Sequence, residues 1–150
     1  IERLIPENPQ RIISLCPSIT ETLFDLGLEN QLVGRTKFCI HPDSKVIKIK
    51  KIGGTKKINE NIIKELKPDL IICQKEENTK EIVEFLEKHY PIFVTDVNNF
   101  DEGIRMIKNI GLITNKLAES ELMIEEIKNS LQNINLKNIL FNFFCLRKFK

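Results

Sequence analysis

The side chains that could perform chemistry are few, and none belongs to a complete catalytic or metal-binding motif. Ser18 follows a β-rich run, but no G-x-S-x-G pattern surrounds it. His41 and His89 are the two histidines, whereas a closed metal site normally takes roughly three or four ligands. Gly53 and Gly54 lack both the G-x-G-x-x-G spacing of a dinucleotide site and the Lys-Ser/Thr pair that follows the last glycine of a phosphate loop. The residue types therefore favour binding over catalysis.

The four cysteines give no metal framework either. Cys16, Cys39, Cys73 and Cys145 are widely spaced and contain no C-x-x-C pair. Cys73 lies within an apolar run and is expected to be a buried small hydrophobe. Cys16 and Cys39 both follow apolar runs and could lie near each other, but unpaired thiols are the favoured interpretation.

Length, composition and charge are those of one ordinary globular domain. The chain has 150 residues, of which 41% are hydrophobic and 29% are charged, values typical of a soluble fold. A net charge of +2 with scattered lysines gives no indication of nucleic acid binding. No apolar run approaches the roughly 20 residues that a membrane-spanning helix needs.

Alternating strand and helix patterns predict a doubly wound, parallel α/β sheet. The β-rich runs lie at 12–15, 31–36, 69–74 and 91–95, and the helical patterns at 18–26, 58–66, 78–86 and 101–110. Residues 43–51 are expected to form a basic connector without a helix. Because parallel strands end at the same edge of a sheet, the loops that follow them should meet there.

Short polar residues suggest where the helices begin. Ser18 is expected to cap the first helix, with Glu21 completing a capping box, and Gly27 suits the left-handed position after that helix. Asn78 and Asp101 are expected to start two later helices. If Ser18 is a cap, its replacement by alanine should cost about 1 kcal/mol of unfolding free energy.

Polar loops after the predicted strands form a candidate binding rim. Its residues are Cys16, Pro17, Ser18, Arg35, Lys37, Phe38, Thr55, Lys75, Glu76, Glu77 and Asn98. Carboxylates alone do not make a catalytic site, so this rim predicts ligand binding.

The last part of the chain has a different pattern. From 115 to about 133, apolar residues recur at spacings of three, four or seven, which predicts one long amphipathic helix. A strand-like run follows at 139–145. We expect this run to begin a second domain and the chain to be a domain cut short.

The order of these segments resembles the substrate-binding proteins of bacterial iron and vitamin B12 ABC importers. The similar segments are 11–21 (RIISL-x-PS-x-TE), 26–28, 33–34, 41–42, 53–56, 66–71 and 75–78. The resemblance covers nearly the whole chain in order. It implies two α/β lobes joined by a long helix, with the ligand held between the lobes.

The resemblance assigns a role to each part of the chain. Residues 1–113 would be the N-terminal ligand-binding lobe, 114–136 the interlobe helix and 137–150 the start of a truncated second lobe. Such a protein is not an enzyme, has no resident cofactor and is exported to the periplasm or cell envelope. It delivers a corrinoid, haem or ferric siderophore to a membrane permease, which it contacts through a surface acid, here Glu60.

The ligand side chains implied by the resemblance differ in part from those of corrinoid-binding relatives. Phe38 matches an aromatic position of that rim, whereas Gln74, and Thr55 or Lys56, stand where other members have aromatic residues. A corrinoid has large apolar faces, so losing aromatic partners disfavours it. Lys37, Lys56 and Lys75 would instead suit carboxylates or phosphates on a siderophore, haem or corrinoid tail.

Two alternatives remain open from the sequence. One is a cytosolic flavodoxin-like enzyme domain that binds a phosphorylated or nucleotide ligand at the same rim. The other is a truncated product that folds in part and binds nothing tightly.

The apolar tail generates the first testable prediction. The apolar residues are Ile139, Leu140, Phe141, Phe143, Phe144 and Phe149. Exposed side chains of this size favour association, because burying each is worth about 2 kcal/mol. We expect a monomer prone to self-association, and deletion of 139–150 should improve solubility and leave the melting temperature nearly unchanged. A large loss of thermal stability would show that the tail belongs to the core of the first lobe.

Overall fold

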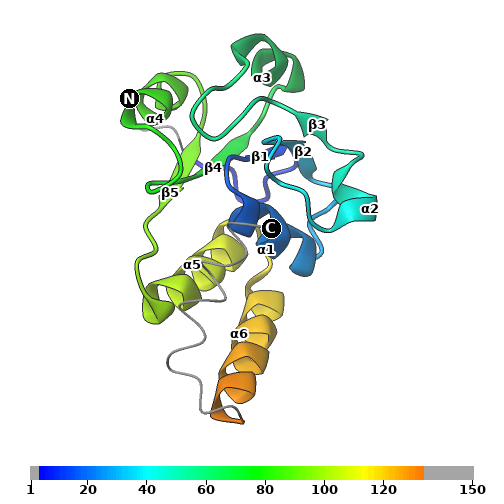
Figure 1. Ribbon diagram of the computed structural model, residues 1–150, viewed down its shortest axis with the longest axis vertical. Helices are drawn as coiled ribbons and strands as arrows, with labels where there is room; N and C mark the ends of the chain where they lie inside the picture. Colours follow the sequence, from blue (N-terminus) through cyan, green and yellow to red (C-terminus); the bar gives the residue numbers. More distant parts are fainter. Residues whose placement is uncertain (1–3, 134–150) are drawn as a thin grey trace.

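The computed structural model describes residues 4–133, so the run at 139–145 and the proposed second-lobe segment lie outside the described residues. Within 4–133, five parallel strands form one sheet in the order β3-β2-β1-β4-β5 (Figure 1). The strands are β1 (Ile12–Ser14), β2 (Leu32–Arg35), β3 (Lys50–Lys51), β4 (Leu70–Gln74) and β5 (Ile92–Thr95). The helices are α1 (Pro17–Asp25), α2 (Asp43–Val46), α3 (Glu60–Leu66), α4 (Lys80–Glu87), α5 (Phe100–Ile113) and α6 (Leu117–Gln132). The predicted parallel α/β lobe is confirmed.

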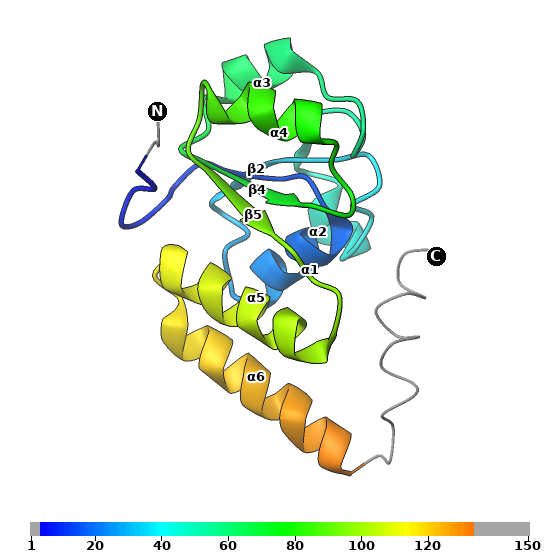
Figure 2. The same ribbon diagram turned by 90° about the vertical axis from the view of Figure 1, so that its left-hand side faces the viewer.

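The sheet separates two hydrophobic cores. Successive side chains of a strand point to opposite faces, and on β1 Ile12 joins the core under α1, α5 and α6, whereas Ile13 joins the core under α3 and α4. On β4, Ile72 and Ile71 divide in the same way, and all four side chains are fully buried. Figure 2 shows α3 and α4 over one face, α1 and α5 over the other, and α6 outside α5.

The connector predicted at 43–51 is wrong in detail. It contains α2, a single helical turn, and β3, a two-residue strand whose exposed lysines pair with the end of β2. Hydrophobic periodicity needs more residues than either element has. Both elements therefore escape a pattern-based prediction.

The capping box predicted at Ser18 is also wrong. Helix α1 begins at Pro17, with Cys16 in the N-cap position and no side-chain cap. Proline suits the first helical position because it has no N–H to leave unpaired. The stability cost expected for loss of a Ser18 cap therefore has no basis in the structure. Gly27, at φ 73°, does occupy the predicted left-handed position.

The two later caps lie at neighbouring residues. Thr79, not Asn78, caps α4, and Asn99, not Asp101, caps α5, each accepting a backbone N–H of the first turn. Several short polar residues adjoin both helix starts, so the sequence offers more than one candidate. Asn78 has a different role, described below.

The long helix predicted at 115–133 is confirmed as α6, and it packs closely on α5. Gly111 of α5 faces Ser120 of α6, and a Cβ atom added at Gly111 would overlap the Ser120 side chain and lie 2.8 Å from the carbonyl oxygen of Lys116. Ile124 extends the contact into the core. Only glycine therefore permits this helix crossing.

The crossing gives a stability prediction. Gly111→Ala should lower the free energy of unfolding by about 1–3 kcal/mol, because the clash with α6 outweighs the gain of about 1 kcal/mol in helix propensity. Lys108→Ala, on the exposed side of the same helix, is the matched control and should change it by less than about 0.5 kcal/mol. Urea unfolding followed by circular dichroism measures both. A stabilised Gly111→Ala variant would contradict the close packing.

Candidate ligand-binding site

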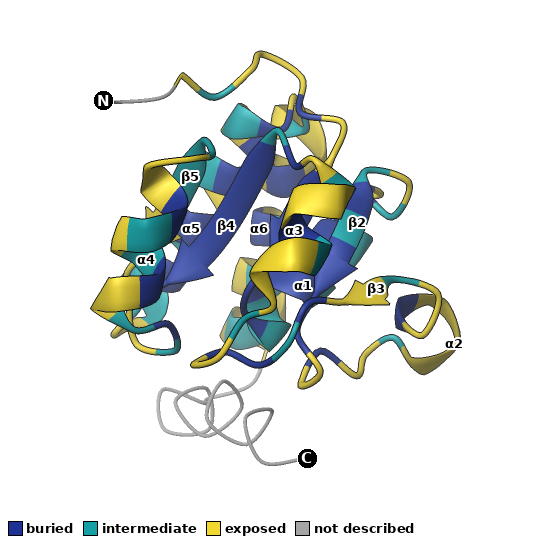
Figure 3. Ribbon diagram, turned by 90° about the horizontal axis from the view of Figure 1, so that it is seen from above, coloured by how far each residue is buried: buried dark blue, intermediate teal, exposed yellow. Residues whose placement is uncertain are grey.

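The loops that follow the parallel strands form one rim at the carboxyl edge of the sheet. Figure 3 looks onto the sheet face that α3 and α4 cover, where the buried strands β4 and β2 lie beneath these helices and mostly exposed loops surround them. The order of strands reverses between β1 and β4, since β2 and β3 lie on one side and β5 on the other. In open α/β sheets, ligands bind where the strand order reverses. The predicted rim residues thus come from loops that share one edge.

One buried side chain ties three of these segments together. The Asn78 Oδ1 atom accepts the backbone N–H of Gln74 at 2.8 Å. Its Nδ2 atom donates to the carbonyl oxygens of Leu15 at 3.1 Å and Thr55 at 3.0 Å. Asn78 is 6% exposed, so all three bonds are shielded from water. They hold the ends of β1 and β4 and the loop after β3 in one arrangement.

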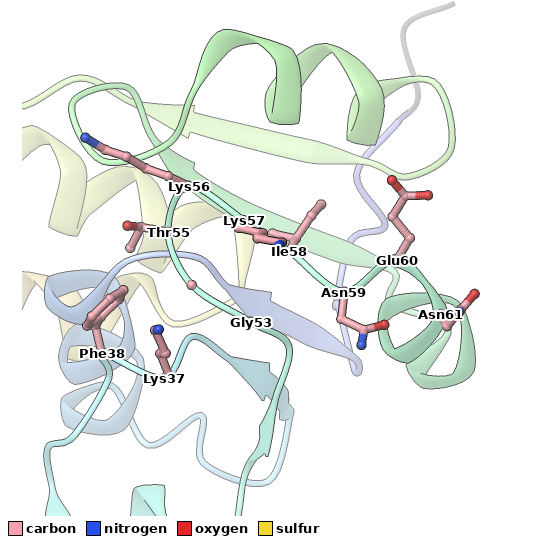
Figure 4. Close-up of a pocket in the computed structure, with 11 residues that line it drawn as sticks. Lys37, Phe38, Gly53, Thr55, Lys56, Lys57, Ile58, Asn59, Glu60 and Asn61 are labelled. Carbon is pink, nitrogen blue, oxygen red and sulfur yellow. The ribbon is translucent and has the colours of Figure 1, made fainter.

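A groove opens between the loops after β2 and β3. Its volume is about 740 Å³, within the range of small-molecule sites. The lining residues are Lys37, Phe38, Gly53, Gly54, Thr55, Lys56, Lys57, Ile58, Asn59, Glu60 and Asn61. In Figure 4, Lys37, Phe38, Thr55 and Lys56 lie toward one end of the groove, and Glu60 and Asn61 lie at the start of α3 at the other. Four of the predicted ligand residues therefore share this groove.

The two walls of the groove are held by backbone contacts. Lys37 N–H donates to the Gly53 carbonyl oxygen at 2.7 Å, and Gly54 N–H donates to that of Lys57 at 2.7 Å. Gly53 has φ 117°, and an added Cβ would lie 2.5 Å from the Lys57 carbonyl oxygen. The Phe38 ring is 51% exposed, and the Lys37 Nζ atom lies 5.1 Å from its centroid. The groove thus presents a flat aromatic face beside a cation.

A second group of predicted residues meets at the reversal point between β1 and β4. The Cys16 Sγ and Ser18 Oγ atoms lie 3.3 Å apart, and each donates to the Gln74 Oε1 atom at 3.5 Å. Burial raises the pKa of the Cys16 thiol to about 11, so the thiol is neutral at pH 7. Pro17 is half-buried at the start of α1. These side chains form a small polar cluster without a charged nucleophile.

Arg35 is a buried side chain that bonds to the backbone near the loop after β2. Arg35 is 3% exposed. Its Nε atom donates to the carbonyl oxygen of Val46 at 3.1 Å, and its Nη1 atom donates to the carbonyl oxygen of Thr36 at 3.3 Å. The Thr36 hydroxyl in turn accepts the N–H of Phe38 at 3.3 Å. Arg35 therefore fixes the loop that carries Phe38, and a direct ligand contact by Arg35 stays a prediction.

The remaining predicted residues lie after β4 and β5. Lys75 pairs with Asp96 at 2.9 Å, and this hydrogen bond raises the pKa of Lys75 and lowers that of Asp96. Asn98 donates to Asp96 at 2.9 Å and to Glu102 at 3.2 Å. Glu76 is exposed and Glu77 half-buried in the turn after β4. None of these residues lines the groove.

The described residues contain few other groups suited to chemistry. Cys16, Cys39 and Cys73 are buried, unpaired thiols, as predicted, and Cys145 lies outside the described residues. His41 pairs with Asp43 at 2.9 Å. From residue 4 to 133, no group of three or more His, Cys, Asp or Glu side chains is arranged to hold a metal ion. Over the same range, no helix combines the length and apolar character required to cross a bilayer.

Sequence reasoning missed several residues of the site, among them Lys57, and it missed the buried role of Asn78. Lys57 lines the groove beside Lys56. The Gly53-Gly54 turn in the sequence could have identified Lys57, because residues that follow such a turn lie at the rim. The sequence places Asn78 in the rim loop after β4 and predicts a helix cap there, because nothing local distinguishes a capping asparagine from one that bonds to distant backbone.

The described residues thus form a parallel α/β lobe with a groove at the carboxyl ends of its strands. Residues 12–138 match the family described as periplasmic binding protein. The chain belongs to the periplasmic binding protein family, which is one of binding proteins, not of enzymes.

Individual relatives agree with this assignment. An ABC transporter substrate-binding lipoprotein of Bacillus subtilis is 28% identical over 137 residues, covering 89% of this chain and 43% of the relative. A vitamin B12-binding protein of Pectobacterium carotovorum is 33% identical over 114 residues, covering 75% and 41%. The chain thus spans less than half the length of these relatives.

Solved structures share the fold. A periplasmic vitamin B12-binding protein of Vibrio cholerae superposes with a TM-score of 0.75 and 25% identity, covering 85% of this chain and 50% of the other. A periplasmic haem-binding protein of Pseudomonas aeruginosa gives a TM-score of 0.77 at 20% identity, covering 83% and 45%. The second similarity concerns the fold alone.

The Asn78 bonds generate a prediction about the rim. Asn78→Ala should lower the free energy of unfolding by about 3 kcal/mol, because three buried backbone groups lose their partner. The matched control is Asn59→Ala, which removes the single cap bond to Ile62 N and should cost about 1 kcal/mol. Urea unfolding measures both. Equal costs would show that the Asn78 bonds add nothing beyond an ordinary cap.

Proposed function

We propose that this chain is the N-terminal lobe of the substrate-binding component of an ABC importer. The observation that carries the proposal is the groove between the loops after β2 and β3, at the carboxyl edge of a parallel sheet in a periplasmic binding protein. The ligand class is that of the relatives, a corrinoid, haem or ferric siderophore. The rim residues predicted from the sequence are proposed to contact it.

The division of the chain into lobes is part of this proposal. Residues 1–113 form the ligand-binding lobe and 114–136 contain the interlobe helix, to which α6 contributes. Residues 137–150 would start the second lobe. The support is that α6 packs outside α5 (Figure 2) and that relatives are about twice as long. A ligand held between two lobes would contact the rim on one side only in this chain.

The proposed partner is the permease of the importer. Glu60 is the first residue of α3, is exposed, and could present its carboxylate to a membrane protein. We propose that Glu60 makes this contact and that the protein acts in the periplasm or cell envelope, as the relatives' names indicate for them. An enzymatic function is disfavoured, because the family consists of binding proteins and the Cys16 cluster has no activated nucleophile.

Binding measurements test this function. The chain should bind its ligand more weakly than micromolar, because one lobe supplies half of the contacts and cannot exclude water. Phe38→Ala should weaken binding about tenfold by removing the aromatic face. Leu112→Ala, 62% exposed on α5, is the control and should leave affinity unchanged. Calorimetry with corrinoid, haem and ferric siderophore measures these affinities.

Two results would contradict the proposal. Submicromolar binding by this chain alone would show that it does not function as one of two lobes. The absence of binding to all three ligand classes at millimolar concentration would show that the rim is not an importer ligand site.

A further inference from the structure

The groove carries an excess of positive charge. Lys37, Lys56 and Lys57 line it, against the single carboxylate of Glu60. The three lysines are exposed, so their ammonium groups are available to a ligand. In Figure 4, the Glu60 carboxylate lies at the α3 end, away from Lys37 and Phe38. The end of the groove with the aromatic ring is therefore cationic.

These lysines have no acidic partner among the described residues. The ion pairs between residues 4 and 133 use other lysines, namely Lys45, Lys75, Lys80 and Lys116. At the rim, Lys75 is paired with Asp96, which balances part of its charge. The free positive charge of the rim is thus concentrated at the groove.

The backbone that carries the cations is held in place. Lys37 and Lys57 both bond through their backbone to the Gly53-Gly54 turn, and an added Cβ on Gly54 would lie 3.3 Å from the Phe38 ring. The backbone of Lys37 and Lys57 is therefore held beside the Phe38 ring, while the exposed lysine side chains can adjust to a ligand. A fixed backbone reduces the ordering cost of binding.

We propose that this groove takes the anionic oxygens of a ligand that also has a flat conjugated or aryl part, and that it disfavours ligands without net charge. The inference rests on the proposed function and narrows its ligand class. Phe38 contacts the flat part, and Lys37 and Lys56 contact the oxygens. Carboxylates of a tetrapyrrole and oxygens of an aryl iron chelate both supply net negative charge, whereas a corrinoid of zero net charge has one phosphodiester anion that the charge of its cobalt centre balances.

Three probe molecules distinguish an anionic tetrapyrrole, an anionic aryl iron chelate and a neutral corrinoid as ligands of the groove. They are zinc protoporphyrin IX, which carries carboxylates, the gallium complex of a tricatecholate chelator, and cyanocobalamin, which has no net charge. Amide NMR titration of the full 150-residue chain measures each affinity. We expect at least one anionic probe to bind about tenfold more tightly than cyanocobalamin at low salt and to weaken toward about 0.15 M salt, where exposed charges are screened.

Matched variants test whether the affinity for the anionic probes depends on the lysines of the groove. Lys37→Gln with Lys56→Gln should reduce anion affinity about tenfold. Lys108→Gln with Lys128→Gln removes equal charge from exposed positions on α5 and α6 and should change affinity less than about twofold. Lys37→Arg with Lys56→Arg should retain binding, and the amide spectrum of each variant reports its folding.

The outcomes separate the inference from the function on which it rests. Equal loss in the groove and control variants, or cyanocobalamin binding as tightly as the anionic probes, would overturn the charge inference and leave the importer function standing. Failure of every probe to shift any amide at millimolar concentration would overturn both.

Discussion

The geometry of the rim depends on the buried side chain of Asn78. At the reversal point of a parallel sheet, the loops diverge and leave backbone groups without ladder partners. Asn78 satisfies the N–H of Gln74 and the carbonyl oxygens of Leu15 and Thr55. A buried amide therefore fixes the loops that meet at this point. The groove opens beside them, among the loops after β2 and β3.

The sheet could be predicted because its determinants are local. Ile12 and Ile13, like Ile71 and Ile72, are apolar on successive positions, as a strand covered on both faces requires. The helix starts could not be predicted to the residue. Ser18 has the right type for a cap, yet Pro17 makes an equally good first residue, and the choice depends on how the chain leaves β1. Local sequence patterns thus predict the helix and sheet layers, whereas tertiary contacts determine the residue at which each helix begins.

The sequence could predict which loops form the candidate site. It could not predict which of their charged side chains are buried or paired and which remain free. Lys75 and Lys56 look alike in the sequence, since each follows a strand or turn at the rim. Their difference arises from Asp96, 21 residues from Lys75, which pairs with it across neighbouring strands. Arg35 is similar, because its burial follows from the fold of α2, which has too few residues to show a pattern. Long-range partners decide which charges stay free.

The polar residues of the rim thus have two roles: buried ones hold the loops in place, and exposed lysines carry the positive charge that a ligand could meet. Asn78 and Arg35 are buried and bonded to backbone, as buried polar groups must be to avoid a desolvation cost. Lys37 and Lys56 remain hydrated, so leaving them without partners costs little. Water also screens them, which limits the strength of any contact with an anion on an open lobe. A second surface that excluded water from the same cations would strengthen the contact without changing a residue of this rim.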